Sequence, residues 1–357
     1  MCAIADPLRA WMGVRWGYAS KQADSGILKA DYAEKGESAM DAGLIARLSE
    51  ISEEEARILQ GGGVDMQLYN EKRRKSVEAS KFLEGKLISI RTHTRFAPFP
   101  PHRHQFIEIM YVCQGAITHV VGDEEITLHA GELLFLGCNS WHEIRAAGER
   151  DIGVNFLIRP AFFRAAFDMM DGQNALSDFI IDSLSGEGSA DEYLHFAVAD
   201  VLPVQNLVEN LIWSLYNGES GSEKLNEMTM GILFLQLMQA PDLARTGGGA
   251  PRQVALRALS YIEAHYIDAT LREFAARNGL AEYTVSRMIK GELGTSFRIL
   301  LMEKRFSAAV HLLNTTELPV SEVIASVGYG NTSYFYRTFQ QKHGCTPQEY
   351  RRRREEV

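Results

Sequence analysis

The chain has 357 residues, 46% of them hydrophobic, and a formal net charge of −9. This length and composition predict two or three globular domains with a real hydrophobic core. No apolar run approaches the about 18 residues of a transmembrane helix. No apolar stretch follows Arg9 and Arg15 either, so a membrane span and a secretion signal are both excluded.

The charge is unevenly distributed along the chain. The residues from Pro251 onward carry 15 Lys and Arg against 11 Asp and Glu, a net charge of +4, so the rest carries −13. This contrast predicts that only the C-terminal part meets a polyanion, although a solvated charged surface is the simpler alternative. The four cysteines show no paired spacing, which favours reduced thiols in a cytoplasmic protein.

The first 60 residues are predicted to form an N-terminal extension. Residues 1–40 hold scattered charges and small residues, and we expect loose structure there. Either Met1 or Met40 could be the native start. A short helix begins behind a capping Ser52 and ends at Gly61.

Residues 86–158 change to the period of β-strands. Short β-branched or aromatic runs alternate with glycine-containing turns, which predicts an all-β barrel or sandwich. The predicted strands begin at Leu87, Phe106, Ala116, Glu125, Glu132 and Ile152.

Four ligand-type side chains occur in this region. His102 and His104 are two residues apart on one strand and therefore point to the same face; Glu108 and His142 can join them. Three nitrogens and one carboxylate suit a divalent transition metal. Without a metal, the same four residues can bond a small polar effector, with Phe106 and Trp141 stacking on it. Aromatic residues in a barrel are more often plain core.

The spacing of these residues resembles the two motifs of the cupin barrel. The first is carried by Pro100-Pro-His102-Arg-His104-Gln-Phe-Ile-Glu108, followed by Gly115, and the second by Gly131-Glu-Leu-Leu-Phe-Leu-Gly-Cys-Asn-Ser-Trp-His142. The chain departs from these motifs at four positions: Phe96 and Asn139 stand for Gly, Gly137 for Pro, and Ala146 for Asn. The resemblance implies a sensor barrel, with or without a metal.

Residues 160–241 are predicted to be helical. Val204, Val208 and Leu211 belong to an apolar stripe, and Met228, Ile232 and Leu235 mark a second helix. We expect helices 204–216 and 225–239 to form a homodimer contact, although an intrachain bundle would use the same residues. Thr246-Gly-Gly-Gly-Ala-Pro is the clearest flexible linker.

The last hundred residues repeat one helical pattern twice. In each copy a short helix ends at a glycine (Gly279, Gly328) and a second helix begins behind Ala281 or Asn331. Capping boxes begin at Thr270 and Thr346. A long helix from about Ser296 to Leu313, with Phe297, Leu301, Ala308 and Leu312 as its buried stripe, joins the two copies. The pattern predicts two helix-turn-helix units, each with one helix for the DNA major groove.

These residues resemble the AraC/XylS family of bacterial transcription regulators. The resemblance is carried by Ser286-Arg-Met-Ile-Lys-Gly-Glu-Leu-Gly, by Val327-Gly-Tyr-Gly-Asn-Thr-Ser-Tyr-Phe-Tyr-Arg-Thr-Phe and by Gly344-Cys-Thr-Pro-Gln-Glu-Tyr-Arg. It implies that base edges are contacted by the following residues: Tyr283, Ser286, Arg287, Thr332, Ser333, Tyr336 and Arg337. Ala281 replaces a usual Ser cap and Ile324 a usual Ala, which puts the fine geometry in question. A helical protein–protein module is the alternative.

The predicted fold is α+β and multidomain: a cupin-like β-barrel with flanking helices, then an all-α tandem helix-turn-helix domain. The predicted divisions are 1–60 (extension), 61–165 (effector domain), 166–245 (dimerisation helices) and 246–357 (DNA-binding domain). The predicted function is a cytoplasmic regulator that binds double-stranded DNA and a small effector, with RNA polymerase as a further partner. It is not predicted to be an enzyme and requires no cofactor. The alternative is a metal-dependent cupin enzyme or a metal-sensing regulator that uses His102, His104, Glu108 and His142.

Overall fold

The computed structural model describes residues 40–70, 76–83, 85–162, 193–218, 221–240 and 243–355. The expected loose structure of residues 1–39 lies outside these ranges, as do residues 163–192 of the segment 160–241 that was predicted to be helical.

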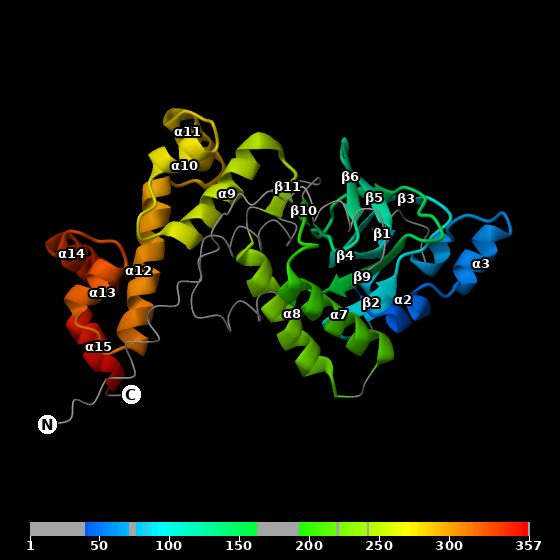
Figure 1. The fold of residues 1–357 in the computed structure, drawn as a ribbon, viewed down its shortest axis with the longest axis horizontal. Helices are drawn as coiled ribbons and strands as arrows, with labels where there is room; N and C mark the ends of the chain where they lie inside the picture. Colours follow the sequence, from blue (N-terminus) through cyan, green and yellow to red (C-terminus); the bar gives the residue numbers. More distant parts are fainter. Residues whose placement is uncertain are drawn as a thin grey trace, which may run out of the picture. The chain divides into compact units, whose positions relative to one another are not determined.

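Two β-sheets form the N-terminal half (Figure 1). The larger sheet has the strand order β11-β10-β7-β4-β9-β2. Its strands are β2 (Ile88–Thr92), β4 (Ile107–Gln114), β7 (Leu133–Leu136), β9 (Ile152–Ile158), β10 (Tyr193–Phe196) and β11 (Ala244–Thr246). Every described ladder in this sheet is antiparallel. The central strands β4, β7 and β9 are almost entirely buried, because the sheet is covered on both faces.

The smaller sheet has the order β1-β3-β8-β5-β6. Its strands are β1 (Ser76–Val77), β3 (Phe99–His104), β5 (Ala116–Val121), β6 (Glu124–His129) and β8 (His142–Ile144). All six strands predicted from the sequence are present. The expected closed barrel is instead a pair of sheets among the described strands, with the interior between them.

Two glycine positions of the cupin motif keep their backbone conformation without glycine. Phe96 has φ +71° and Asn139 has φ +65°, and they are the two non-glycine residues with positive φ in the described ranges. Left-handed backbone is costly for a residue with a Cβ atom, by about 1 kcal/mol. The chain therefore retains the turn geometry of the motif even where the sequence departs from it.

Short N-terminal helices pack onto this half. They are α2 (Ala42–Leu48), α3 (Glu53–Leu59), the 3-10 turn η2 (Met66–Leu68) and α4 (Ala79–Leu83). Ser52 and Glu55 form a complete capping box at α3, as the sequence predicts for this helix. Leu44 and Leu48 of α2 join the same hydrophobic cluster as the larger sheet, so part of the predicted extension belongs to the sensor core.

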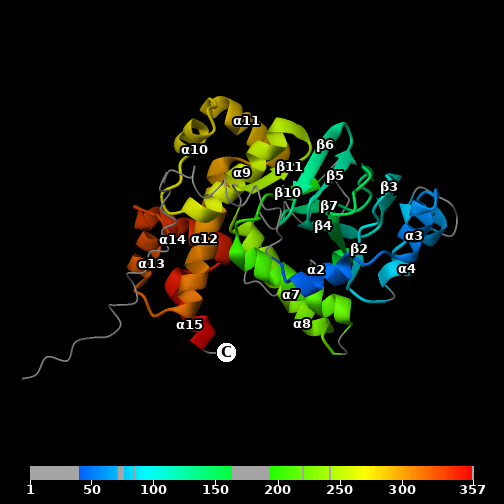
Figure 2. The same cartoon turned by 45° about the vertical axis from the view of Figure 1, so that its right-hand side comes forward.

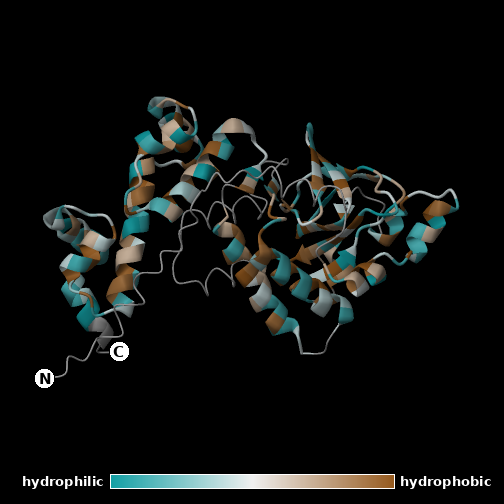
Figure 3. Ribbon diagram, viewed as in Figure 1, coloured by the Kyte–Doolittle hydropathy of each residue, from teal (hydrophilic) through white to brown (hydrophobic). Residues whose placement is uncertain are grey.

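Helices α7 (Leu202–Asn217) and α8 (Glu223–Met238) pack against each other, and α7 also contacts β2 (Figures 1 and 2). The α7 stripe proposed for dimer contact is buried inside the chain, since Val204, Val208 and Leu211 are fully covered. The intrachain alternative is therefore correct for α7. On α8, by contrast, Met228 and Ile232 remain exposed. Figure 3 shows apolar and polar residues mixed along both helices.

The predicted flexible linker has defined structure. Ala244–Thr246 form strand β11, which pairs with β10, and α9 (Gly249–His265) begins three residues later. Gln253 of α9 accepts a hydrogen bond from the Thr246 amide at 2.8 Å and donates one to the Ala244 carbonyl at 3.1 Å. Strand β11 and helix α9 thus include four of the six residues of the predicted linker and leave Gly247 and Gly248 between them.

The C-terminal half contains α9 and six further helices: α10 (Leu271–Arg277), α11 (Glu282–Leu293), α12 (Phe297–Thr315), α13 (Val320–Ser326), α14 (Thr332–His343) and α15 (Pro347–Glu355). The long helix α12 joins the pair α10–α11 to the pair α13–α14 (Figure 1). Its buried residues are Phe297, Leu300, Phe306, Ala309 and Leu313. The predicted stripe was thus displaced by one position at three of its four residues, which are only partly buried.

The predicted caps differ in detail. Thr346 and Glu349 bond reciprocally as a capping box. Thr270 accepts a hydrogen bond from the Glu273 amide, but the Glu273 carboxylate pairs with Arg277. Ile324 is fully buried among the core residues of the second unit, so its extra volume relative to Ala is accommodated there.

Candidate nucleic-acid interface and ligand cavity

Helix α11 presents one polar face above a buried one. Val285 and Ile289 are fully buried, whereas Tyr283 is 75% exposed and Arg287 is also exposed. Ser286 is partly exposed. The Arg287 guanidinium lies 5.9 Å from the Tyr283 ring centre, which orients both side chains on the same outer face.

Helix α14 repeats this arrangement. Phe335 and Phe339 are fully buried, and Thr332, Ser333 and Arg337 are exposed. Tyr336 differs from the other predicted contacts because its ring packs partly against the hydrophobic cluster of the second unit.

The two helices start differently. The Asn331 side chain accepts a hydrogen bond from the Tyr334 amide at 3.0 Å, which caps α14. Ala281 gives α11 no side-chain cap. Loss of such a cap costs about 1 kcal/mol, so the α11 amides remain available for another acceptor, such as a phosphate oxygen.

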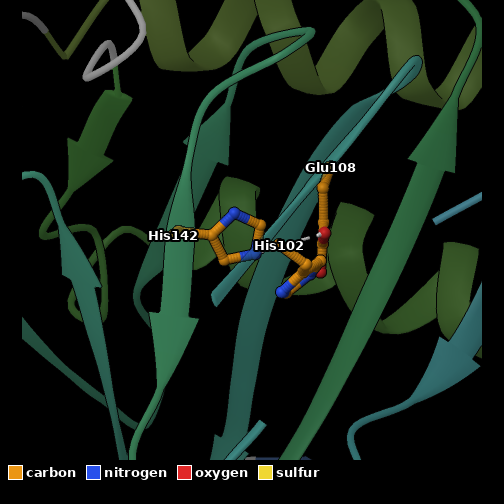
Figure 4. A group of neighbouring side chains, drawn as sticks. All are labelled: His102, Glu108 and His142. Carbon is orange, nitrogen blue, oxygen red and sulfur yellow. Dashed lines mark ion pairs between the residues drawn. The ribbon is translucent and has the colours of Figure 1, made fainter. Parts of the chain in front are cut away.

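A group of buried side chains lies between the two sheets. His102 comes from β3, Glu108 from β4 and His142 from β8, and one ligand atom of each lies within 4.8 Å of the others (Figure 4). The His142 Nε2 is 3.8 Å from Glu108 Oε2, and the His102 and His142 ring centres are 4.1 Å apart. The β3–β8 pairing places His102 opposite His142.

His104 lies beside this cluster and contacts Glu108. Its Nε2 lies 3.2 Å from Glu108 Oε2, and its ring stacks on Phe106 with centres 4.6 Å apart. It lies outside the group of three whose ligand atoms converge. Of the four residues predicted to share a metal, the structure therefore brings three together and places the fourth against their carboxylate.

Hydrogen bonds to backbone carbonyls set the tautomers of these histidines. Nδ1 of His102 donates to the Pro100 carbonyl at 2.9 Å, and Nδ1 of His104 donates to the Phe106 carbonyl. The Nε2 atoms of His102 and His104 therefore carry a lone pair and no hydrogen. Nε2 of His104 and Nε2 of His142 have no hydrogen-bond partner.

Burial disfavours the charged form of each of these groups. Desolvation lowers the pKa of His104 to about 3 and that of His102 to about 4. It raises the pKa of Glu108 to about 7, with Arg91 opposing the shift. The pKa of His142 is also held well below its ordinary value by burial. Because imidazolium is disfavoured, the histidines stay neutral at the pH of the cell.

Sequence reasoning missed two more buried histidines. His119 of β5 is fully buried, and neither of its ring nitrogens has a hydrogen-bond partner; its ring centre lies 5.8 Å from that of His142. His93, just after β2, is also buried, and its Nε2 has no hydrogen-bond partner. The inward alternation of Ile117, His119 and Val121 along β5 is the sequence signal that could have identified the first of these.

A cavity adjoins the cluster. It offers about 30 Å³ to the centres of water-sized molecules, and since one water needs about 10–15 Å³, it holds about two. His93, His102, Phe106 and Glu108 line it. Trp141 is not among its lining residues and instead lies beneath the Arg103 guanidinium, 5.5 Å away.

Polar groups close the opposite end of the cavity. Arg91 bonds Glu54 and Thr94 at 3.1 and 2.9 Å, and Tyr69 donates to Glu54 at 2.8 Å. Glu54 belongs to α3, outside the strands of the cupin motif. Phe82 of α4 lines the cavity itself, so an N-terminal helix contributes to its wall.

Comparison with known proteins agrees with both halves. A family model described as a helix-turn-helix domain matches residues 274–353, and one described as a cupin domain matches residues 92–154. The HTH-type transcriptional activator RhaR of Mannheimia succiniciproducens is 25% identical over 267 residues, 72% of this chain and 88% of that protein. Its namesake from Yersinia pestis is 22% identical over 283 residues, 78% of this chain and 93% of that protein.

Among solved structures, the C-terminal domain of AraT, a response regulator from Geobacillus stearothermophilus, is 41% identical, covers 28% of this chain and 85% of its own, and has a TM-score of 0.27. In the described parts of the chain, no helix is both long and apolar enough to cross a membrane.

A cupin domain followed by two helix-turn-helix units defines a DNA-binding transcription regulator. The named relatives are HTH-type transcriptional activators. The chain thus combines an N-terminal cupin domain with a C-terminal AraC-type helix-turn-helix domain, and it is similar to AraC-family transcriptional activators at 22–25% identity.

Proposed function

We propose that this regulator acts in the cytoplasm and reads two successive major-groove segments with α11 and α14. The observation that carries the proposal is the matched pair of exposed arginines, Arg287 and Arg337, each on a helix whose opposite face is buried. Arginine bonds guanine in a bidentate manner. Ser286, Ser333 and Thr332 add hydroxyl groups that can bond a base or a phosphate.

The binding of a fluorescent promoter fragment to Arg287→Ala, Arg337→Ala and the double variant tests this assignment. Each lost bidentate contact costs about 1–3 kcal/mol, so each single variant should bind about 5- to 150-fold more weakly. Arg145→Ala, an exposed arginine of the sensor domain, is the matched control. Equal affinity in the double variant and the control would contradict the proposal.

We infer that the cupin domain senses a ligand and does not turn over a substrate. The relatives named above are regulators, and the interior holds about two waters, which leaves little room for a substrate. A bound ligand shifts a regulator only through different affinities for its two arrangements. Strand β11 and the Gln253 bonds offer a direct route from the sensor sheet to α9. Contact with RNA polymerase stays a prediction.

We propose that this ligand is a divalent transition metal. Nε2 of His104 and Nε2 of His142 lie 3.2 and 3.8 Å from Glu108 Oε2. The raised pKa of Glu108 favours a proton on this carboxyl, which a divalent cation would displace. Two acceptors at 3.2 Å repel unless a proton or a cation lies between them, and neutral imidazole with carboxylate is a common ligand set for Zn²⁺, Ni²⁺ or Fe²⁺. His102, Glu108 and His142 would hold the ion, and His104 would orient the carboxylate, as outer ligands do in metal sites.

We also propose a homodimer formed through the outer face of α8. Leu225, Met228 and Ile232 are 62%, 54% and 47% exposed and lie at the i, i+3, i+7 spacing of a helix-to-helix seam. The same stripe on a second copy is its natural complement in a two-fold dimer. Light scattering should show Ile232→Glu as a monomer and Leu59→Glu, which alters an exposed apolar residue of α3, as a dimer. An unchanged mass for Ile232→Glu would contradict this contact.

A further inference from the structure

The second helices of the two helix-turn-helix units repeat with an offset of 50 residues. Gly294 and Gly344 end α11 and α14 with φ +66° and +69°. Val285 matches Phe335, Ile289 matches Phe339, and all four are fully buried. A residue of α11 therefore occupies the same place in its unit as the residue 50 positions later does in α14.

This register extends the outward face of each helix beyond the contacts predicted from the sequence. At about 100° per residue, positions 283, 287 and 290 lie on the side opposite Val285 and Ile289, and position 286 lies at the edge of this side. The matching positions of α14 are 333, 336, 337 and 340. Lys290 and Gln340 are both exposed, and each follows its arginine by three residues.

The spacing along the helix axis fits neighbouring base pairs. Lys290 lies about 4.5 Å beyond Arg287 along the helix, at about 1.5 Å per residue. Base pairs in DNA are about 3.4 Å apart, and the major groove is about 12 Å wide. A helix lying in the groove can thus place the arginine on one base pair and the residue three positions later on the next.

We propose that Lys290 and Gln340 determine specificity and make the two half-sites different. Lysine pairs with guanine O6 and N7, whereas glutamine pairs with adenine N6 and N7. The operator then holds two segments about one helical turn of DNA apart. Each segment has a guanine at the same position, which pairs with Arg287 in one segment and with Arg337 in the other. The neighbouring base pair is G·C in the segment that faces α11 and A·T in the segment that faces α14. This inference rests on the proposed DNA-reading function.

Selection of binding sites from random double-stranded DNA by the full chain tests the proposal. Wild type should enrich the two-segment motif. Lys290→Gln should change the neighbouring base pair from G·C to A·T in one segment only, and Gln340→Lys should make the converse change in the other. The preference should shift by about 5- to 150-fold, since a good bidentate pair discriminates by about 1–3 kcal/mol. Glu292→Gln, an exposed change off this face, should leave the motif unchanged.

The outcomes separate this inference from the function on which it rests. If wild type selects a two-segment motif and the exchanges weaken binding to all sequences equally, Lys290 and Gln340 contact phosphate, and the inference is overturned while the reading of DNA stands. If wild type enriches no motif, the reading of DNA is itself contradicted, and the inference fails with it.

Discussion

Arg95 and Glu55 form an ion pair that is almost completely removed from water. The Arg95 Nε lies 2.7 Å from Glu55 Oε1, and the two side chains are 3% and 4% exposed. Glu55 belongs to α3, and Arg95 follows β2. Arg95 also donates to the carbonyls of Ser49 and Glu149. This pair therefore ties the N-terminal helices to the sensor sheets.

Breaking the pair should strongly destabilise the sensor domain. Glu55→Gln leaves a buried guanidinium without its counter-charge, which costs about 3–5 kcal/mol. Glu125→Gln removes the partner of Arg145 in an exposed pair (58% and 54% exposed) and should cost less than about 1 kcal/mol. Urea unfolding of both variants measures the difference. Equal free energies of unfolding for the two variants would contradict the prediction that the buried pair stabilises the domain more than the exposed pair does.

The apo protein should be most stable near pH 6.5–7. Burial lowers the pKa of His93 and His104 to about 3, so the unfolded chain binds more protons below pH 6.5, and acidification destabilises the fold. Burial raises the pKa of Glu108 to about 7. The Glu108 carboxyl therefore binds its proton more tightly in the folded than in the unfolded protein. Its ionisation lowers the stability of the fold as pH rises from about 4.5 to 7, and this loss of stability remains above pH 7.

Glu108→Gln isolates the second effect. Relative to its effect at pH 4, this substitution should stabilise the apo protein by about 3 kcal/mol at pH 8. The reason is that burial raises the pKa of Glu108 from 4.5 to about 7, and each pKa unit corresponds to about 1.4 kcal/mol. The measurement is the free energy of unfolding from pH 4 to 9. An identical pH profile for the variant and wild type would contradict this reading of Glu108.

Two glycines in matching turns should tolerate alanine very differently. Gly279 and Gly328 both have positive φ, +66° and +86°. A Cβ atom on Gly279 meets nothing within 4 Å, whereas one on Gly328 would lie 2.2 Å from the Ile267 carbonyl oxygen. Gly279→Ala should cost about 1 kcal/mol for its backbone, and Gly328→Ala about 2–4 kcal/mol in all. Thermal unfolding and DNA affinity check this; equal losses would contradict the contact with Ile267.

Transition metal should stabilise the protein through His142. At about 100 times its dissociation constant, Zn²⁺ or Ni²⁺ adds about 2.7 kcal/mol and should raise the Tm by about 5–10 °C. His142→Ala should abolish this rise. His195→Ala is the matched control, because His195 of β10 also pairs with a carboxylate, Glu132, but does not belong to the cluster. A rise of equal size in the His142→Ala protein would place the metal elsewhere.

Local signals made the C-terminal half predictable from the sequence. Asn331, Thr346 and the turn glycines cap the ends of their own helices. Such local signals can be recognised in the sequence without knowing which element packs against the helix. The stripe of α12 was displaced because Leu300 and Leu301 are both apolar and periodicity alone does not choose between them.

Properties that depend on a distant partner could not be predicted in the same way. The apolar face of α7 indicates burial but not whether its partner is this chain or a second copy. Strands β10 and β11 have four and three residues and exist only because each pairs with a neighbour. The place of His119 in the histidine cluster depends on the pairing of β5 with β8, which brings His142 beside it. Whether these histidines hold a metal stays a prediction.

Methylation interference on a selected operator tests the central claim most directly, since it reports guanine N7 contacts in the major groove. Two reader helices predict interfering guanines in two clusters on one face of the duplex, about 10 base pairs apart. Arg287→Ala should remove interference from one cluster only, and Arg337→Ala from the other. A single cluster for the wild-type protein, or the loss of both clusters in each variant, would contradict a paired reader.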